Sequence, residues 1–255
     1  MTPSMVSVLV MVLAAGQASR PATADTAAWR VAGLPARVAR DMARLGSMPS
    51  IVILAAGGGA AFAVHPADAA AVRSLSGSVA AEESLDAGAT IGGAPVQLGL
   101  AAAVYGIGLA SHHAGAAATG SALVEAQLVG GVVTQGLKYA VDRTRPDGGH
   151  HSFPSGHTSA TFTTADIVAQ RFGWRAGAAA YAAAAYVAAS RMAERDHYLS
   201  DTVFGAAIGV AAARTIRASP GRRSIVVNPV ALKGGGAVFV SVGIDGGDRH
   251  WIPNP

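Results

Sequence analysis

The sequence predicts an all-α protein, a bundle of helices with a small β-hairpin at its C-terminal end. Long apolar segments rich in Ala and Gly recur along the chain between glycine and polar breaks, which is the pattern of packed helices. The composition agrees, because 51% of the 255 residues are hydrophobic and only 13% are charged. Near the C-terminus the pattern changes to short runs of β-branched residues on either side of a glycine turn, and this predicts a hairpin.

Six segments have the length and composition of helices. Their small residues favour close packing of helices, as at Gly205 and Gly209, but drive insertion into lipid only weakly. A compact bundle therefore fits the sequence at least as well as a set of membrane spans. The segments are 48–64, 96–118, 121–141, 158–172, 174–190 and 201–217.

The two ends of the chain differ from this core. Residues 5–16 are apolar but too few to span a bilayer, and Ala22-Thr23-Ala24 has the small-x-small pattern of a signal-peptidase site. We therefore expect residues 1–24 to be a signal peptide or an N-terminal anchor. At the other end, 224–232 and 237–244 are the expected strands, and one face of this hairpin should pack on the bundle.

The charge balance excludes some classes of protein. The excess of 19 Lys and Arg over 15 Asp and Glu is small, with no basic run and few aromatic residues, so no nucleic-acid partner is expected. The chain has no cysteine, which rules out disulfides and thiolate chemistry.

Cations gather at the end of the predicted helix 121–141. Lys138 lies in its last turn, and Arg145 follows seven residues later, directly before Pro146, which prevents the helix from continuing. Taken alone, these cations could simply stabilise the negative end of a helix dipole.

Two further clusters contain groups that bind anions and transfer protons. Ser155 and Gly156 precede a predicted helix, whose N-terminal N–H groups can hold an anion, and His157 stands beside them. In the second cluster Arg191 offers a forked guanidinium, and His197 and Asp201 have i, i+4 spacing. On a helix the last two would share a face, so the carboxylate could fix the tautomer of the imidazole.

Together these clusters resemble the three-part signature of the phosphatidic acid phosphatase type 2 superfamily, which includes bacterial acid phosphatases, lipid phosphatases and vanadium haloperoxidases. The resemblance covers residues 138–201 directly and implies a helical bundle of the phosphatase and haloperoxidase type. The matching stretches are Lys138-x6-Arg145-Pro146, Pro154-Ser155-Gly156-His157 and Ser190-Arg191-x5-His197-x3-Asp201.

The resemblance also implies roles for these residues. Lys138, Arg145 and Arg191 would neutralise the oxygens of a phosphoryl group, and Ser155, Gly156 and the backbone of His157 would complete the cradle. His197 would attack phosphorus, His157 would protonate the leaving oxygen, and Asp201 would orient His197. No metal and no cofactor are expected.

The function expected is that of a metal-independent phosphatase, acting on a small phosphomonoester or on a phospholipid or polyprenyl (pyro)phosphate. Two alternatives stay open, a vanadate-dependent haloperoxidase and a catalytically silent anion-binding membrane protein. We expect export to the periplasm or the outer face of a bacterial inner membrane, and leave membrane association open. Residues 25–95 would form an N-terminal helical segment, 96–217 the catalytic core and 218–255 the hairpin tail.

Other polar residues carry weaker signals. The adjacent pairs His112-His113 and His150-His151 would make poor chelating sites, because neighbouring side chains on a helix point in different directions. Asp142, Arg143 and Asp147 flank the first motif, and we expect them to be solvated loop charges or local ion pairs. On this interpretation Arg143→Ala would have almost no effect on activity.

Overall fold

The structure is a computed structural model, and it describes residues 33–77, 85–216, 223–232 and 235–244, with only the backbone of the last two ranges. The expected leader, residues 1–24, lies outside these ranges. The elements are α1 (Leu34–Arg44), α2 (Met48–Val64), the 3-10 turn η3 (His65–Ala67), α3 (Asp68–Leu75), α5 (Ala87–Gly92), α6 (Ala94–Ala110), α7 (Ala114–Val141), α8 (Gly156–Phe172), α9 (Trp174–Ala193), α10 (Leu199–Thr215), β1 (Arg223–Leu232) and β2 (Gly235–Ile244).

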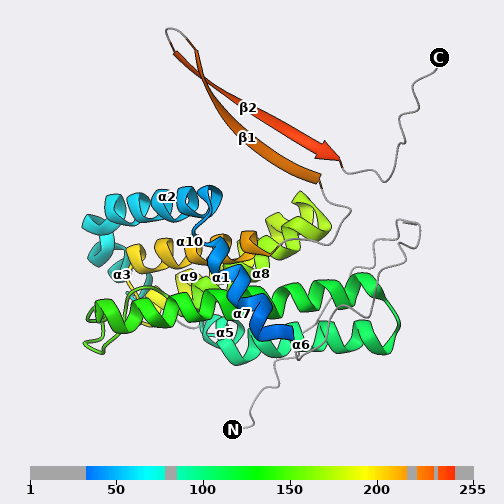
Figure 1. The fold of residues 1–255 in the computed structure, drawn as a ribbon. Coiled ribbons are helices and arrows are strands. Elements are labelled where there is room, and N and C mark those ends of the chain that lie inside the picture. The colour runs from blue at the N-terminus through cyan, green and yellow to red at the C-terminus, as the bar shows by residue number, and fades with distance from the viewer. Residues whose placement is uncertain (1–32, 78–84, 217–222, 233–234, 245–255) are drawn as a thin grey trace, which may run out of the picture.

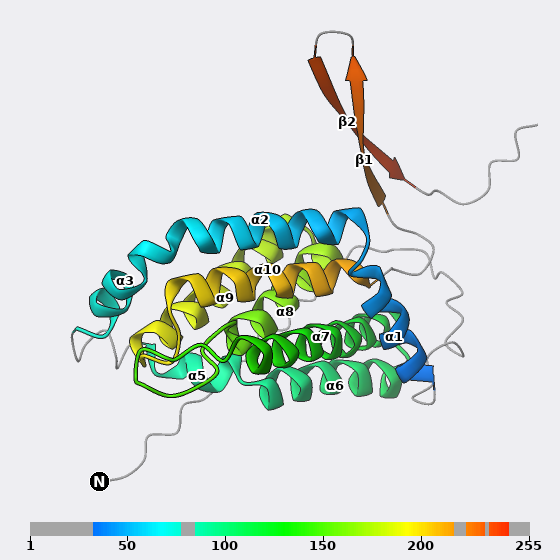
Figure 2. The same cartoon turned by 60° about the vertical axis from the view of Figure 1, so that its left-hand side comes forward.

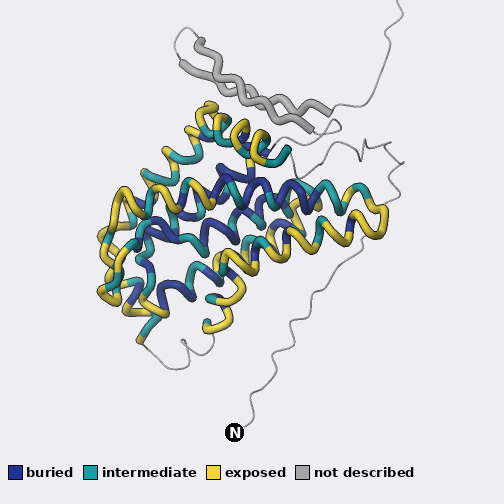
Figure 3. The backbone as a smooth tube through the Cα atoms, turned by 60° about the horizontal axis from the view of Figure 1, so that its bottom comes forward, coloured by how far each residue is buried: buried dark blue, intermediate teal, exposed yellow. Residues whose placement is uncertain are grey.

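The all-α bundle is confirmed, and α10 lies at its centre. The helix packs against α8 and α7 on its inner side and against α2 on its outer side (Figure 1). Its residues Ile208, Ala211 and Ala212 are almost completely buried. Figure 3 shows the buried stretches of the helices, in dark blue, gathered inside the bundle. The long helix α7 runs antiparallel to α6, and the loop after α7 returns to the end of the bundle that also holds α3 (Figure 2).

One predicted helix boundary is wrong. The segment 96–118 was expected as a single helix, but the chain turns at residues 111–113, and α7 begins at Ala114. His112 has a positive φ of 54°, and the ring of His113 accepts a hydrogen bond from Ala116 N. This histidine therefore caps α7, a role for which Ser, Thr, Asp and Asn are the usual residues. Ala-rich sequence on both sides of the turn hides it from a pattern analysis.

Small residues bring α10 very close to α8, as predicted. A Cβ atom added at Gly205 would lie 2.6 Å from the carbonyl oxygen of Ser155, and one added at Gly209 would lie 2.3 Å from that of Ser159. Both contacts are with backbone rather than with flexible side chains. The start of α8, which carries the second motif, is therefore positioned by direct backbone contact with α10.

The outer helix α2 is apolar all round but little buried. Its exposed side chains include Met48, Val52 and Phe62, of which Phe62 is 83% exposed. Among the described residues two helical stretches are long and apolar enough to cross a membrane, residues 48–75 and α7, with 11% and 56% of the most apolar window buried.

The C-terminal hairpin has the predicted strands. β1 and β2 pair antiparallel, with Arg223 opposite Ile244 and Leu232 opposite Gly235. Because the side chains of the hairpin lie outside the described part of the structure, its packing on the bundle stays a prediction.

The contact between α8 and α10 can be tested with a matched pair of glycine variants. Gly209→Ala should lower the free energy of unfolding by about 1–3 kcal/mol, because the added methyl group meets backbone atoms that cannot move aside. Gly136→Ala on the exposed face of α7 meets nothing within 4 Å, and should be neutral or gain up to about 1 kcal/mol. Denaturant unfolding measures both variants, and equal effects would contradict the packing described here.

Candidate active site

Residues from all three motifs meet at the end of the bundle where α7 ends and α8 and α10 begin. A cavity of about 520 Å³ opens there between α6, α7 and α8. Its polar end is formed by Lys138, Arg145, Gly156, His157, Asp196 and His197.

The two cations of the first motif hold the loop that follows α7. The helix stops at Val141 because Asp142 adopts a left-handed conformation, with φ 42°. Lys138 Nζ donates to the carbonyl oxygen of His151 at 2.6 Å, and Arg145 Nε donates to that of His150 at 2.9 Å. Lys138, in the last turn of α7, and Arg145, in the loop after it, both line the cavity.

The second motif forms the N-terminus of α8. Ser155 is the N-cap, and its hydroxyl oxygen accepts hydrogen bonds from the backbone N–H and the hydroxyl of Thr158 at 3.4 and 3.0 Å. Ser155 is fully buried and does not line the cavity, so in this structure it shapes the turn. Gly156 and His157 do line the cavity, beside the N–H groups of the first turn of α8.

Arg191 does not line the cavity, but it is paired with Asp196, which does. It is 3% exposed and forms ion pairs with Glu194 and with Asp196, the latter at 3.1 Å. Asp196 also accepts from Arg145 Nη1 at 2.7 Å, so one carboxylate joins two of the three predicted clamps. The Nε atom of Arg191 is buried without a hydrogen-bond partner among the described residues.

His197 and Asp201 are adjacent, but the assumption that they share a helix is wrong. α10 begins at Leu199, so His197 precedes the helix and Asp201 stands in its first turn. The distance between His197 Nδ1 and Asp201 Oδ2 is 3.8 Å, too long for a hydrogen bond, and Nδ1 has no partner in the described part of the chain. Asp201 Oδ2 instead accepts from Ser152 Oγ at 2.5 Å and from the backbone N–H of Tyr198 at 2.8 Å.

Burial determines the protonation of the two histidines. It lowers the pKa of His157 to about 4, and the nearby Arg191 guanidinium acts in the same direction. Burial also lowers the pKa of His197. For Asp201 burial alone would raise the pKa, but its polar neighbours, among them His197, Ser152 and Arg143, outweigh this and hold the pKa below its usual value. At neutral pH both imidazoles are therefore neutral, and Asp201 is a carboxylate.

Arg143 was expected to be a solvated loop charge or to form a local ion pair, but its two ion pairs are with carboxylates 75 and 58 residues away in the sequence. Its side chain is 22% exposed, and it donates to Asp201 Oδ1 at 2.6 Å and to Asp68 Oδ2 at 2.8 Å. Sequence reasoning also missed Asp68 and Ser152, whose partners Arg143 and Asp201 are distant in sequence, and Asp196, which occupies an unspecified position inside the third motif. Only the excess of cations around the first motif hinted that carboxylates were needed nearby.

The remaining histidine pairs do not line the cavity, although the backbone of His150 and His151 binds its two cations. His112 and His113 form the turn before α7, while His150 and His151 pair with the carboxylate of Asp142 at 3.4 and 3.0 Å. Within the described residues no group of three or more His, Asp or Glu side chains could hold a metal ion.

Comparison with known proteins agrees with the second and third motifs. A model of the PAP2 superfamily matches residues 147–224, which contain the second and third motifs. A lipid A 1-phosphatase from Porphyromonas gingivalis is 39% identical over 87 residues, which are 32% of this chain and 19% of that relative. The chain thus matches about a fifth of the length of this curated relative. The family match confirms the resemblance seen in the sequence for the second and third motifs, while Lys138 and Arg145 of the first motif lie outside the matched range.

Two solved structures share the fold. LpxE of Aquifex aeolicus superposes with a TM-score of 0.50 and 19% identity, covering 58% of this chain and 92% of the other. A transmembrane PAP2-type phosphatidylglycerolphosphate phosphatase from Bacillus subtilis gives a TM-score of 0.51 and 17% identity, covering 72% and 92%.

The buried His157 makes folding stability depend on pH. The unfolded chain binds a proton at the ordinary pKa of 6.5, whereas the folded chain binds it only at about 4. The stability from neutral His157 is thus fully present above 6.5 and is lost as pH falls toward the folded pKa. Between about pH 7 and about pH 5 the urea midpoint should fall, and it should fall less in His157→Gln. His150→Gln, at a 72% exposed side chain, should follow the parent, and identical slopes in all three chains would contradict the assignment.

Proposed function

We propose that the protein is a metal-independent phosphatase that hydrolyses a phosphomonoester through a phosphohistidine intermediate. The observation that carries the proposal is the meeting of Lys138, Arg145, His157 and His197 at the polar end of one cavity, with Arg191 paired with Asp196, which also lines it. Three fixed positive charges can balance the charge on phosphoryl oxygens, which is the task of metal ions in many other phosphatases.

The first step would be an in-line attack by His197. Its Nδ1 lies on the side of Asp201, which leaves Nε2 as the atom to form the bond to phosphorus. As the N–P bond forms, the bond from phosphorus to the ester oxygen breaks, and that oxygen takes a proton from His157. The imidazole of His197 becomes cationic, and the carboxylate of Asp201 stabilises this charge.

The second step would release phosphate. His157, now neutral, accepts a proton from a water molecule as the water oxygen attacks phosphorus. The N–P bond breaks, and its electron pair returns to His197. The low pKa of His157 suits its role as the base in the second step. In the first step the charge of a bound phosphate dianion would raise the pKa of His157, which suits its role as the acid.

A lipid phosphate is the substrate class that the cavity fits best. Away from its polar end, the cavity is walled mainly by apolar residues of α6 and α7, beside Gln127, Thr134 and Gln135 of α7. A small water-soluble ester would leave the apolar part of this wall uncovered. The apolar residues are Ala94, Leu98, Leu128, Gly131 and Val132. The relative from Porphyromonas gingivalis is a lipid A 1-phosphatase, and the structural neighbour from Bacillus subtilis also acts on a phospholipid.

A membrane location follows from the same proposal. The exposed apolar side chains of α2 and α6, such as Phe62 and Ile107, would lie against lipid, and the helical stretch 48–75 and α7 are long and apolar enough to cross it. The site at the end of the bundle would then stand near the membrane surface. We propose the outer face of a bacterial inner membrane, in keeping with the signal-like residues 1–24.

The roles of the histidines are tested by trapping the intermediate with radiolabelled phosphate ester in the presence of EDTA. The parent chain should give an acid-labile, base-stable phosphoenzyme, and His197→Ala should give none. His157→Ala should lower kcat about 100-fold or more on an alkyl phosphate but far less on p-nitrophenyl phosphate, whose leaving group departs without a proton. Labelling of His197→Ala, or loss of labelling with EDTA, would contradict the mechanism.

The substrate class is tested at the apolar wall. Leu128→Gln places a polar group beside the expected lipid chain, so kcat/KM on a long-chain lipid phosphate should fall about tenfold while p-nitrophenyl phosphate is unaffected. Leu109→Gln, at an exposed position of α6 outside the cavity, is the matched control and should leave both substrates unchanged. Equal loss on both substrates in Leu128→Gln would argue for a small soluble substrate.

A further inference from the structure

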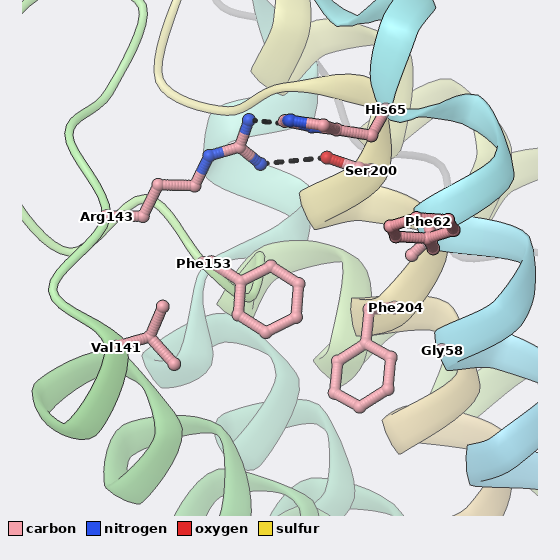
Figure 4. Close-up of a pocket in the computed structure, with 9 residues that line it drawn as sticks. Gly58, Phe62, His65, Val141, Arg143, Phe153, Ser200 and Phe204 are labelled. Atoms are coloured by element: carbon pink, nitrogen blue, oxygen red, sulfur yellow. Dashed lines mark hydrogen bonds between the residues drawn. The ribbon is translucent and has the colours of Figure 1, made fainter.

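Arg143 joins two buried carboxylates that are far apart in the sequence. One is Asp201, in the first turn of α10, and the other is Asp68, the first residue of α3. The guanidinium also donates to Ser200 Oγ at 2.8 Å and lies over the ring of Tyr198, 4.2 Å from its centre. Figure 4 shows the side chain reaching toward His65 and Ser200.

Asp68 is the fixed end of this arrangement. It is 4% exposed, and its Oδ1 accepts from the backbone N–H of Ser200 at 2.8 Å. Its Oδ2 accepts from Ser200 Oγ at 2.7 Å and from Arg143 Nη2 at 2.8 Å, and His65 Nδ1 lies 2.8 Å away. Asp68 therefore binds the N-terminus of α10 and one side of the guanidinium at the same time.

Asp201 is the end that faces the site. It is completely buried, and Arg143 is the donor to Oδ1, whereas Ser152 and Tyr198 donate to Oδ2. Without Arg143, Oδ1 would lose this charged partner, and the carboxylate could rotate away from His197. A buried charge that loses its partner is costly, so the bridge constrains the orientation of the carboxylate strongly.

The surroundings of Arg143 keep these ion pairs strong. Beside it lies an apolar groove of about 350 Å³, whose walls include Phe62, Phe153 and Phe204 (Figure 4). Phe153 and Phe204 stack with their ring centres 5.1 Å apart. An apolar wall weakens screening by water, so the charge of Arg143 acts on Asp201 with little attenuation.

From this geometry we infer that Arg143 is a positioning residue, which sets the orientation and effective charge of Asp201 and through it the basicity of His197. Asp68, far outside the signature motifs, holds Arg143 in place and takes up part of its charge. The inference rests on the proposed function, in which His197 is the nucleophile. Other charged and titratable groups also act on His197: Lys138 from α7, His157 from α8, Asp196 from the preceding loop and Asp201 from α10.

Removing Arg143 and removing its partner Asp68 should shift the pKa of His197 in opposite directions. Arg143→Gln removes a positive charge from Asp201, so the imidazolium form of His197 is favoured and its pKa should rise by about one unit. Asp68→Asn removes a negative charge and leaves the guanidinium to Asp201 alone, so the pKa of His197 should fall. Arg143→Lys keeps the charge but cannot bridge both carboxylates, and its shift should lie between those of Arg143→Gln and the parent.

The measurement is an NMR titration of the full chain in detergent, with isotope-labelled histidine. The His197 signal is identified by its loss in His197→Gln. Arg73→Gln, an exposed arginine on the same helix as Asp68, is the matched control and should leave the titration unchanged. An unchanged His197 titration in both Arg143→Gln and Asp68→Asn, or shifts of the same sign, would overturn the inference. If Arg143→Gln fails to fold, the Arg143→Lys and Asp68→Asn titrations decide the matter.

Kinetics separate this inference from the proposed function. In an active parent enzyme the acid limb of kcat should move with the pKa of His197 in each variant, while KM changes little, because Arg143 does not touch the substrate. An inactive parent chain would contradict the proposed phosphatase function, whereas the titration would still decide the role of Arg143. An active parent with unmoved pH profiles would contradict the inference alone.

Discussion

The completely buried carboxylate of Asp201 is the constraint on which the site depends. A buried charge is tolerated only when its oxygens are paired, and here the donors come from separate segments: Arg143 and Ser152 in the loop after α7, and Tyr198 at the cap of α10. Satisfying Asp201 therefore fixes the long loop against the start of α10. Because this loop also carries Arg145, the pairing of one carboxylate helps to form the cationic end of the cavity.

The close approach of α8 and α10 provides the second constraint. At Gly205 and Gly209 the backbone of α10 touches that of α8, so the position of the N-terminus of α8 relative to Asp201 is fixed. Ser155, buried at the cap of α8, donates its backbone N–H to the carbonyl oxygen of Asp201 at 3.0 Å. The glycines allow α8 and α10 to come into contact, and the hydrogen bonds around Asp201 fix how the two helices are placed relative to each other.

Much of the helical arrangement and of the cavity could be predicted from the sequence, because periodic composition and motif spacing are local properties. Lys138, Arg145, His157 and His197 do meet. What failed depended on tertiary contacts. The i, i+4 spacing of His197 and Asp201 assumed a helix that in fact begins at residue 199, and Arg143 looked expendable because its partner Asp68 lies 75 residues away. A carboxylate among Ala-rich residues gives no local sign of the cation that it will bind.

The position of α2 has a consequence for the order of synthesis. At Gly57 this helix packs against Ala207 of α10, so α2 leaves the ribosome about 150 residues before the helix that covers it. At roughly 5–20 residues per second, α2 is without that partner for on the order of ten seconds or more. During this time its apolar surface must be shielded by lipid or a chaperone. The site can form only after α10 has been made, because Asp201 lies in that helix and His197 directly before it.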